Sequence, residues 1–107
     1  MGEVLVKRDE DNRLAGFTLQ GMQADTTASA SAIHLLRATV ASVSGYLHIR
    51  ANFSTGKEFL LTIDRSDPHL NREIDAIMET LLIGLKMLAE EYPDDLVVRE
   101  ARAEVRV

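Results

Sequence analysis

The amino-acid sequence predicts an α+β fold in two layers, in which about five strands form a mixed or antiparallel sheet and two helices pack on it. Short segments alternate between apolar and polar residues, and two longer segments repeat apolar residues every three or four positions. The predicted order of elements is therefore ββαββαβ. At 107 residues the chain has the size of one domain, which we expect to span residues 1–107.

A hairpin is predicted at the beginning of the chain. Residues 4–6 and Leu14–Gln20 have the composition of strands, and the polar residues 9–12 between them are typical of a turn. In the second strand, Ala15, Phe17 and Leu19 alternate with Gly16, Thr18 and Gln20, which makes one face apolar. We expect this strand to end at Gly21, where a loop begins.

The loop leads into a predicted helix that begins at one of three capping residues, Asp25, Thr26 or Thr27, and ends near Val43. Its inward face is a stripe with helical spacing, made of Ser29, Ile33, Leu36, Val40 and Val43. Ser29 is therefore expected on the buried side of the first turn.

A second hairpin and a long helix follow. Residues 46–53 alternate regularly, residues 54–57 predict a turn, and Phe59, Leu61 and Ile63 continue the inner face. The Ser-Asp-Pro sequence at 66–68 predicts the start of a helix, which ends at Tyr92 because proline disfavours helical geometry in the residue before it. The broadest apolar stripe of the chain lies on this helix: Ile74, Ile77, Met78, Leu81, Leu82, Leu85 and Leu88.

The C-terminal segment predicts one more strand at residues 96–98. The alternating tail 101–107 either extends that strand or pairs with a second copy of the chain.

Composition excludes several classes of function. Twelve lysine and arginine residues against 17 aspartate and glutamate residues give a net charge of −5, which opposes binding to nucleic acid. The absence of cysteine excludes disulfides, thiolate zinc sites and thiol catalysis. The acidic residues at 9–11 and 94–95 are expected in solvated turns, so no metal or cofactor is predicted. Because no leader or membrane-spanning run is present, we expect a cytoplasmic protein away from the membrane.

The segment 21–28 has the layout of an active-site loop. A loop that opens on a glycine at a strand end and closes at a helix N-terminus is a common place for a nucleophile. There the unpaired backbone N–H groups and the helix dipole stabilise an anion. In this chain the loop leads to Ser29, which has no neighbouring base in the sequence.

The order of elements and three sequence stretches resemble the Prp family, the ribosomal-processing cysteine proteases. The stretches are Val-Leu-Val-Lys-Arg-Asp-Glu at 4–10, the Gly21 loop with Ser-Ala-Ser at 29–31, and the segment 81–93, which ends in Leu-Ala-Glu-Glu-Tyr-Pro. Each stretch is modest alone, whereas their order and spacing together are fairly specific. The resemblance covers nearly the whole chain.

The resemblance implies a Cys/His dyad that trims the N-terminal extension of a large-subunit ribosomal protein. On this sequence the family's histidine falls on Met22 and its cysteine on Ser29, if the shorter loop of some members is the right comparison. With the longer loop, the nucleophile falls nearer His34. Either way the dyad is missing. The resemblance further implies a homodimer, and we assign Gly21 and Asp25 to peptide binding.

A serine at this position requires a positioned general base, because its hydroxyl holds the proton far more tightly than a thiol does. Met22 cannot accept that proton. His34 lies five residues beyond Ser29, about 140° away around a helix. His48 is expected on the outer face of a strand and His69 in the turn before the long helix. None of the three has a sequence reason to reach Ser29.

The sequence thus favours a Prp-like protein that retains the substrate-recognition scaffold without peptidase activity. One alternative is an active cysteine protease in which Ser29 replaces a native cysteine by engineering; the second replacement, at Met22, argues against it because one change would suffice. The other alternative is a homodimeric interaction module without a peptide cleft.

Overall fold

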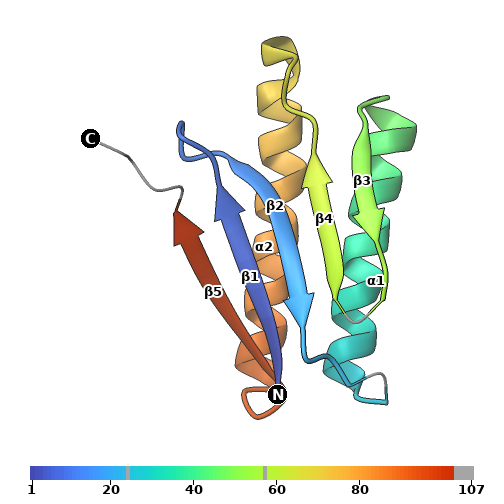
Figure 1. Ribbon diagram of the computed structural model, residues 1–107, viewed down its shortest axis with the longest axis vertical. Coiled ribbons are helices and arrows are strands. Elements are labelled where there is room, and N and C mark those ends of the chain that lie inside the picture. The colour runs from blue at the N-terminus through green and yellow to red at the C-terminus, as the bar shows by residue number, and fades with distance from the viewer. Residues whose placement is uncertain (24, 57, 103–107) are drawn as a thin grey trace.

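The structure is a computed structural model that describes residues 1–23, 25–56 and 58–102, and it has the predicted α+β architecture (Figure 1). The chain order ββαββαβ is confirmed. The elements are strands β1 (Gly2–Arg8) and β2 (Leu14–Gln20), helix α1 (Thr27–Ala41), strands β3 (Ala51–Ser54) and β4 (Phe59–Ile63), helix α2 (Asn71–Glu91) and strand β5 (Leu96–Arg102).

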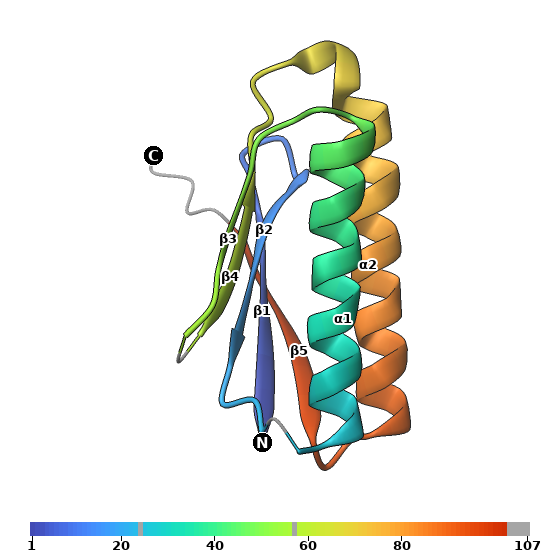
Figure 2. The same ribbon diagram turned by 90° about the vertical axis from the view of Figure 1, so that its right-hand side faces the viewer.

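The five strands form one mixed sheet in the order β3-β4-β2-β1-β5. Strand β1 pairs in parallel with β5 and antiparallel with β2, and the remaining pairs are antiparallel. Both helices lie on the same face of the sheet (Figure 2). This arrangement leaves the other face of the sheet without a covering helix.

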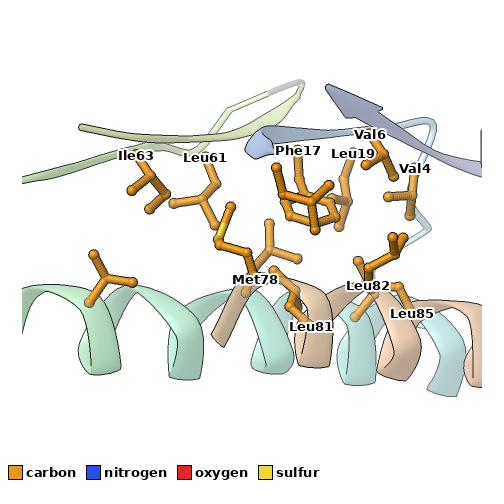
Figure 3. Close-up of a cluster of buried hydrophobic side chains, with 14 of the residues drawn as sticks. Val4, Val6, Phe17, Leu19, Leu61, Ile63, Met78, Leu81, Leu82 and Leu85 are labelled. Carbon is orange, nitrogen blue, oxygen red and sulfur yellow. The ribbon is translucent and has the colours of Figure 1, made fainter. Parts of the chain in front are cut away.

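The hydrophobic core lies between the sheet and the helices (Figure 3). Val4 and Val6 of β1, with Phe17 and Leu19 of β2, are fully buried there, as the alternating pattern predicts. The long helix contributes Ile74, Met78, Leu81, Leu82 and Leu85, all buried. Ile77 and Leu88, from the same predicted stripe, are half-buried.

Helix α1 packs through smaller side chains than the sequence suggests. Ser29 and Leu36 are buried as expected, whereas Ile33 and Val40 are only half-buried. The buried face contains instead Ala28, Ala32 and Thr39. The helix therefore lies with its small residues toward the core and the larger ones at the margin.

The expectation of a strand from residue 46 is wrong, because β3 begins only at Ala51. A π-helical turn, Ser42–Tyr46, continues α1, and the backbone N–H of Ile49 donates to the carbonyl of Val43 at 3.1 Å. His48 has a left-handed φ of 56°, so it is not on a strand.

The C-terminal strand is longer than the predicted 96–98, since β5 extends to Arg102. Lys57 of the predicted turn 54–57 and residues 103–107 of the tail lie outside the described residues.

A cluster of charges fixes the end of the domain where α2 begins. Asp75 of α2 forms ion pairs with Arg13, beside the β1–β2 turn, and with Arg65, beyond β4. Arg65 also donates to the carbonyl oxygen of Leu14 at 2.8 Å, and its side chain is only 9% exposed. Two loops and a helix are therefore tied together by one carboxylate and one buried guanidinium group.

A second ionic contact lies further along the same helix. The Arg8 guanidinium donates to Glu79 at 2.9 Å, and this hydrogen bond, helped by the nearby charge of Glu100, raises the pKa of Arg8 despite its partial burial. Strand β1 is thus tied to both α2 and β5.

Candidate functional site

The predicted site lies at the opposite end of the domain. There β2 ends, α1 begins, and the turn between α2 and β5 passes beside the first residues of the chain (Figure 1). Residues that are distant in sequence therefore meet at one edge of the two layers.

Gly21 allows the chain to leave the sheet at this edge. Its φ is +64°, a left-handed conformation that glycine adopts without strain. A Cβ atom at this position would also lie 2.9 Å from the carbonyl oxygen of Met1. The conformation and the close contact together explain why position 21 requires glycine. The part of Gly21 in peptide binding remains a prediction.

Thr26 is the N-cap of α1, so the structure identifies which of the three predicted capping residues caps the helix. Its hydroxyl accepts a hydrogen bond from the backbone N–H of Ser29 at 3.2 Å and donates to the carbonyl oxygen of Gln23 at 3.0 Å. Asp25 is exposed and does not cap the helix. The helix begins at Thr27, and Ser29 occupies its first turn as expected.

Met22 packs against the beginning of β1. A Cβ atom on Gly2 would lie 2.5 Å from the sulfur of Met22, so the thioether occupies the space that a larger residue at position 2 would need. Met22 is half-buried beside the core. A flexible apolar side chain fills such a gap well.

A small cavity of about 90 Å³ lies beside Ser29. Its walls come from the N-terminal residues, the Gly21 loop, the first turn of α1 and the α2–β5 turn: Met1, Gly2, Gln23, Thr26, Ser29, Asp94 and Asp95. Both aspartates lie in a turn as expected, with Asp94 exposed and Asp95 half-buried, and they line this cavity together with Ser29. Their arrival follows from the antiparallel course of the two helices, which places the end of α2 next to the beginning of α1.

Ser29 is buried, with 1% of the residue exposed, and the described residues that line its cavity do not include a histidine. His34 lines a separate groove on the outer side of the helices, and His48 and His69 are exposed. A serine without an imidazole in reach lacks the base that Ser/His hydrolysis requires.

Over the described part of the chain, no group of three or more histidine, cysteine, aspartate or glutamate side chains is arranged to hold a metal ion. Within the same ranges, neither helix has the length and hydropathy needed to cross a bilayer.

Comparison with solved structures identifies the architecture. The essential ribosomal processing protease Prp from Staphylococcus aureus, solved in complex with a substrate peptide, superimposes with a TM-score of 0.80 at 21% identity, over 94% of this chain and 100% of that one. The chain has the Prp fold. The same protease with a covalently linked product peptide matches the Prp fold of this chain with a TM-score of 0.80 at 18% identity, over 94% and 100% of the two chains.

A third similar structure is SMU.848 from Streptococcus mutans, with a TM-score of 0.83 at 13% identity over 96% of each chain. No protein-family model and no curated protein sequence matches this chain. Three-dimensional similarity therefore supports the Prp fold, in agreement with the resemblance of the three sequence stretches.

Proposed function

We propose that residues 1–107 act as one Prp-like domain that holds an extended peptide without hydrolysing it. The observation that carries this proposal is Ser29, which is 1% exposed, has no histidine in its cavity and takes the place that the resemblance gives to the cysteine. The same resemblance gives Met22 the place of the histidine. The peptide we favour is the N-terminal segment of a large-subunit ribosomal protein, bound in the cytoplasm.

The fold supports retention of peptide binding. The S. aureus protease with the same fold has been solved with a substrate peptide bound. In this chain the Gly21 loop and the first turn of α1 keep the strand-loop-helix arrangement, held by the Thr26 cap. Gly21 and Asp25 remain the loop residues that we assign to peptide contacts.

A cleavage and binding assay tests this function with a peptide that spans the ribosomal-protein extension. We expect the chain to bind the peptide and leave it intact, and the double variant Met22→His with Ser29→Cys to cleave it. The helix N-terminus and an adjacent imidazole lower the pKa of a thiol toward neutrality.

A matched control is Met22→His with Ser31→Cys, which places the thiol in the outer groove between the helices. This control should bind without cleaving. Cleavage by the unaltered chain would contradict the proposed inactivity, and failure of the unaltered chain to bind would contradict the peptide function.

A homodimer is a second proposal, favoured by the outer surface of the helical layer. Ile83 and Met87 of α2 are 58% and 62% exposed there, beside two apolar grooves of about 550 and 430 Å³ between α1 and α2. Burying this surface against a second copy would remove apolar area from water. Light scattering at micromolar concentration measures the mass directly, and a monomer that persists on concentration would contradict the proposal.

A further inference from the structure

Strand β5 forms one edge of the sheet (Figure 1), and among the described strands it pairs with β1 alone. The N–H of Gly2 in β1 donates to the carbonyl oxygen of Asp95, directly before β5, at 2.9 Å. The N–H of Leu96 points the other way, since it donates to the carbonyl oxygen of Tyr92 at 3.1 Å. The hydrogen-bonding groups of β5 therefore face the free edge and β1 in alternation, beginning with the free edge at Leu96.

This alternation leaves two residues inside β5 with their backbone groups directed outward. Val97 and Arg99 direct N–H and C=O toward β1, whereas Val98 and Glu100 direct theirs toward the free edge. Over the described ranges, no further strand lies beyond that edge. An edge of this kind is a template for pairing with another extended chain.

A groove of about 410 Å³ lies beside this edge, between β5 and the last turns of α2. Leu96 and Val98 line it from the strand and Ala89 from the helix; Leu96 is buried and the other two are half-buried. The strand residues with outward backbone groups thus also supply apolar surface on the helical side of the sheet. Peptides that add to a sheet edge use this combination, because main-chain hydrogen bonds give affinity and pockets for alternate side chains give specificity.

The charges at the groove favour a basic peptide over an acidic one. Lys86 and Glu90 of α2 line the groove about one helical turn apart. Lys86 forms an ion pair with Glu100 at 3.6 Å, whereas Glu90 has no ion pair within the described ranges. Because Glu90 is exposed, a basic side chain beside the groove complements its charge.

A separate peptide fits this groove better than a second copy of the chain does. The β5 strand of a second copy can pair with the edge, but its Leu96 is 1% exposed within its own core and is not available to fill the groove. An extended peptide has its alternate side chains free to do so. Met1 lines both this groove and the cavity beside Ser29, so a peptide along β5 leads toward the predicted site.

We propose that the free edge of β5 binds an extended peptide as an added strand. An apolar side chain of the peptide occupies the groove beside α2, and a neighbouring basic side chain lies near Glu90. This inference rests on the proposed peptide function and adds to it a binding surface and the side chains that are recognised.

Titration of the ¹⁵N-labelled full chain, followed by NMR, tests the groove with capped heptapeptides. The parent peptide is Gly-Lys-Thr-Leu-Thr-Lys-Gly, and two derivatives carry glutamine in place of the leucine or glutamate in place of both lysines. We expect the parent to shift the amide signals of Val98 and Glu100. The glutamine peptide should bind at least about tenfold more weakly because apolar burial is lost, and the glutamate peptide should also bind more weakly than the parent.

Two backbone-methylated peptides separate strand addition from binding through side chains alone. One carries an N-methyl group on the leucine and the other on both threonines. A leucine in the groove directs its N–H toward β5 in an antiparallel pairing and away from it in a parallel pairing, and the threonines do the reverse. We expect one methylated peptide to lose binding and the other to retain it, which also identifies the direction of the added strand.

Amide hydrogen exchange gives a second readout of the same geometry. With the parent peptide at saturation, exchange at Val98 and Glu100 should slow by at least about tenfold, because their N–H groups gain partners. Val97 and Arg99 already face β1 and should change less.

Variants of the chain test the groove itself. Ala89→Leu fills it and should weaken binding of the parent peptide by at least about tenfold. Ala38→Leu is the matched control, since it makes the same change in the outer groove between the helices, and it should bind within about twofold of the unaltered chain. Val98→Thr keeps the shape of the side chain and should weaken binding by a smaller factor, which also covers the case in which Ala89→Leu does not fold.

The outcomes distinguish this inference from the proposed function. Equal binding of the leucine and glutamine peptides, or binding of both methylated peptides as tightly as the parent, would overturn the β5 site. Slow exchange at Val98 and Glu100 that depends on protein concentration without peptide would overturn it in favour of self-pairing of β5. If the ribosomal-protein peptide binds and neither it nor the parent peptide shifts the β5 signals, only this inference fails. If neither peptide binds, both proposals are wrong.

Discussion

The two ends of this domain differ in whether their charged side chains form ion pairs. Where α2 begins, Asp75 joins Arg13 and Arg65, and the buried Arg65 also bonds the backbone of Leu14. Where α2 ends, Asp94 and Asp95 face a cavity without an ion pair among the described residues. The first arrangement fixes loops to the helix, whereas the described residues include no ion pair that fixes the second.

This difference indicates where the molecule departs from maximal stability. Proteins commonly leave polar groups incompletely satisfied at functional sites and compensate elsewhere. Here the core and the arginine cluster stabilise the domain, while the described residues include no ion pair at the cavity. Three measurements test the contrast, in order of decreasing expected effect.

The largest effect is expected in the core beneath both ends. Ile74 lies in the part of α2 that is next to Asp75, and Leu85 lies in the part that leads to the cavity end. Both side chains are 0% exposed. Truncation of either to alanine should lower the free energy of unfolding by about 2–5 kcal/mol, measured by denaturant titration. Met87→Ala, at an exposed position, should cost under about 1 kcal/mol. A loss of similarly small size for Leu85→Ala alone would show that the cavity end is also poorly packed.

An intermediate effect is expected for Asp75→Asn. The substitution removes the carboxylate that compensates Arg65, whose side chain is 9% exposed, while Asp75 itself is 34% exposed. The free energy of unfolding should fall by about 1–3 kcal/mol, the cost of weakening a partly buried charged contact.

The control for Asp75→Asn is Glu3→Gln, because the ion pair of Glu3 with Arg99 is exposed and should contribute under about 1 kcal/mol. Equal effects of the two variants would mean that the arginine cluster does not stabilise its end of the domain.

The smallest effect on stability is expected at the cavity. Asp94→Asn combined with Asp95→Asn should change the free energy of unfolding by less than about 0.5 kcal/mol, or increase it slightly, because neighbouring like charges are removed and the described residues contain no ion pair to break. Denaturant midpoints measure this alongside Glu91→Gln. A loss above about 1 kcal/mol would assign the two aspartates to structure and remove the contrast between the ends.

Most of the fold follows from local patterns, and the exception has a local cause. Periodicity predicts both helices and all strands, because each element buries one face against the other layer. The alternating pattern places the start of β3 five residues too early, although Leu47 and Ile49 are half-buried as the pattern predicts. The partner strand β4 pairs only as far as Ala51 opposite Ile63, so the preceding residues have no ladder to join. Their backbone bonds to the π-helical turn instead.

The candidate site was predictable only in part. Capping residues and the terminal glycine of β2 place Ser29 in a first turn, which is local information. Asp94 and Asp95 reach the cavity through contacts between the start of α1 and the α2–β5 turn, which are about 65 residues apart in the chain. Alternation and capping are local patterns and do not predict such contacts. The signal that could have indicated them is the predicted topology itself, since antiparallel helices bring the Tyr92–Pro93 exit beside the start of α1.

The cavity beside Ser29 can form only after β1 and β5 have paired in parallel. Gly2 lies opposite Leu96, so this ladder joins segments separated by almost the whole described chain. Such non-local pairing forms late in folding because loop closure is entropically costly. Since the ladder also seats Asp95 beside Gly2, the cavity exists only once β5 has docked. Fraying of that edge strand would open the cavity before the core opens, and amide hydrogen exchange at β5 would therefore report on the lifetime of the cavity.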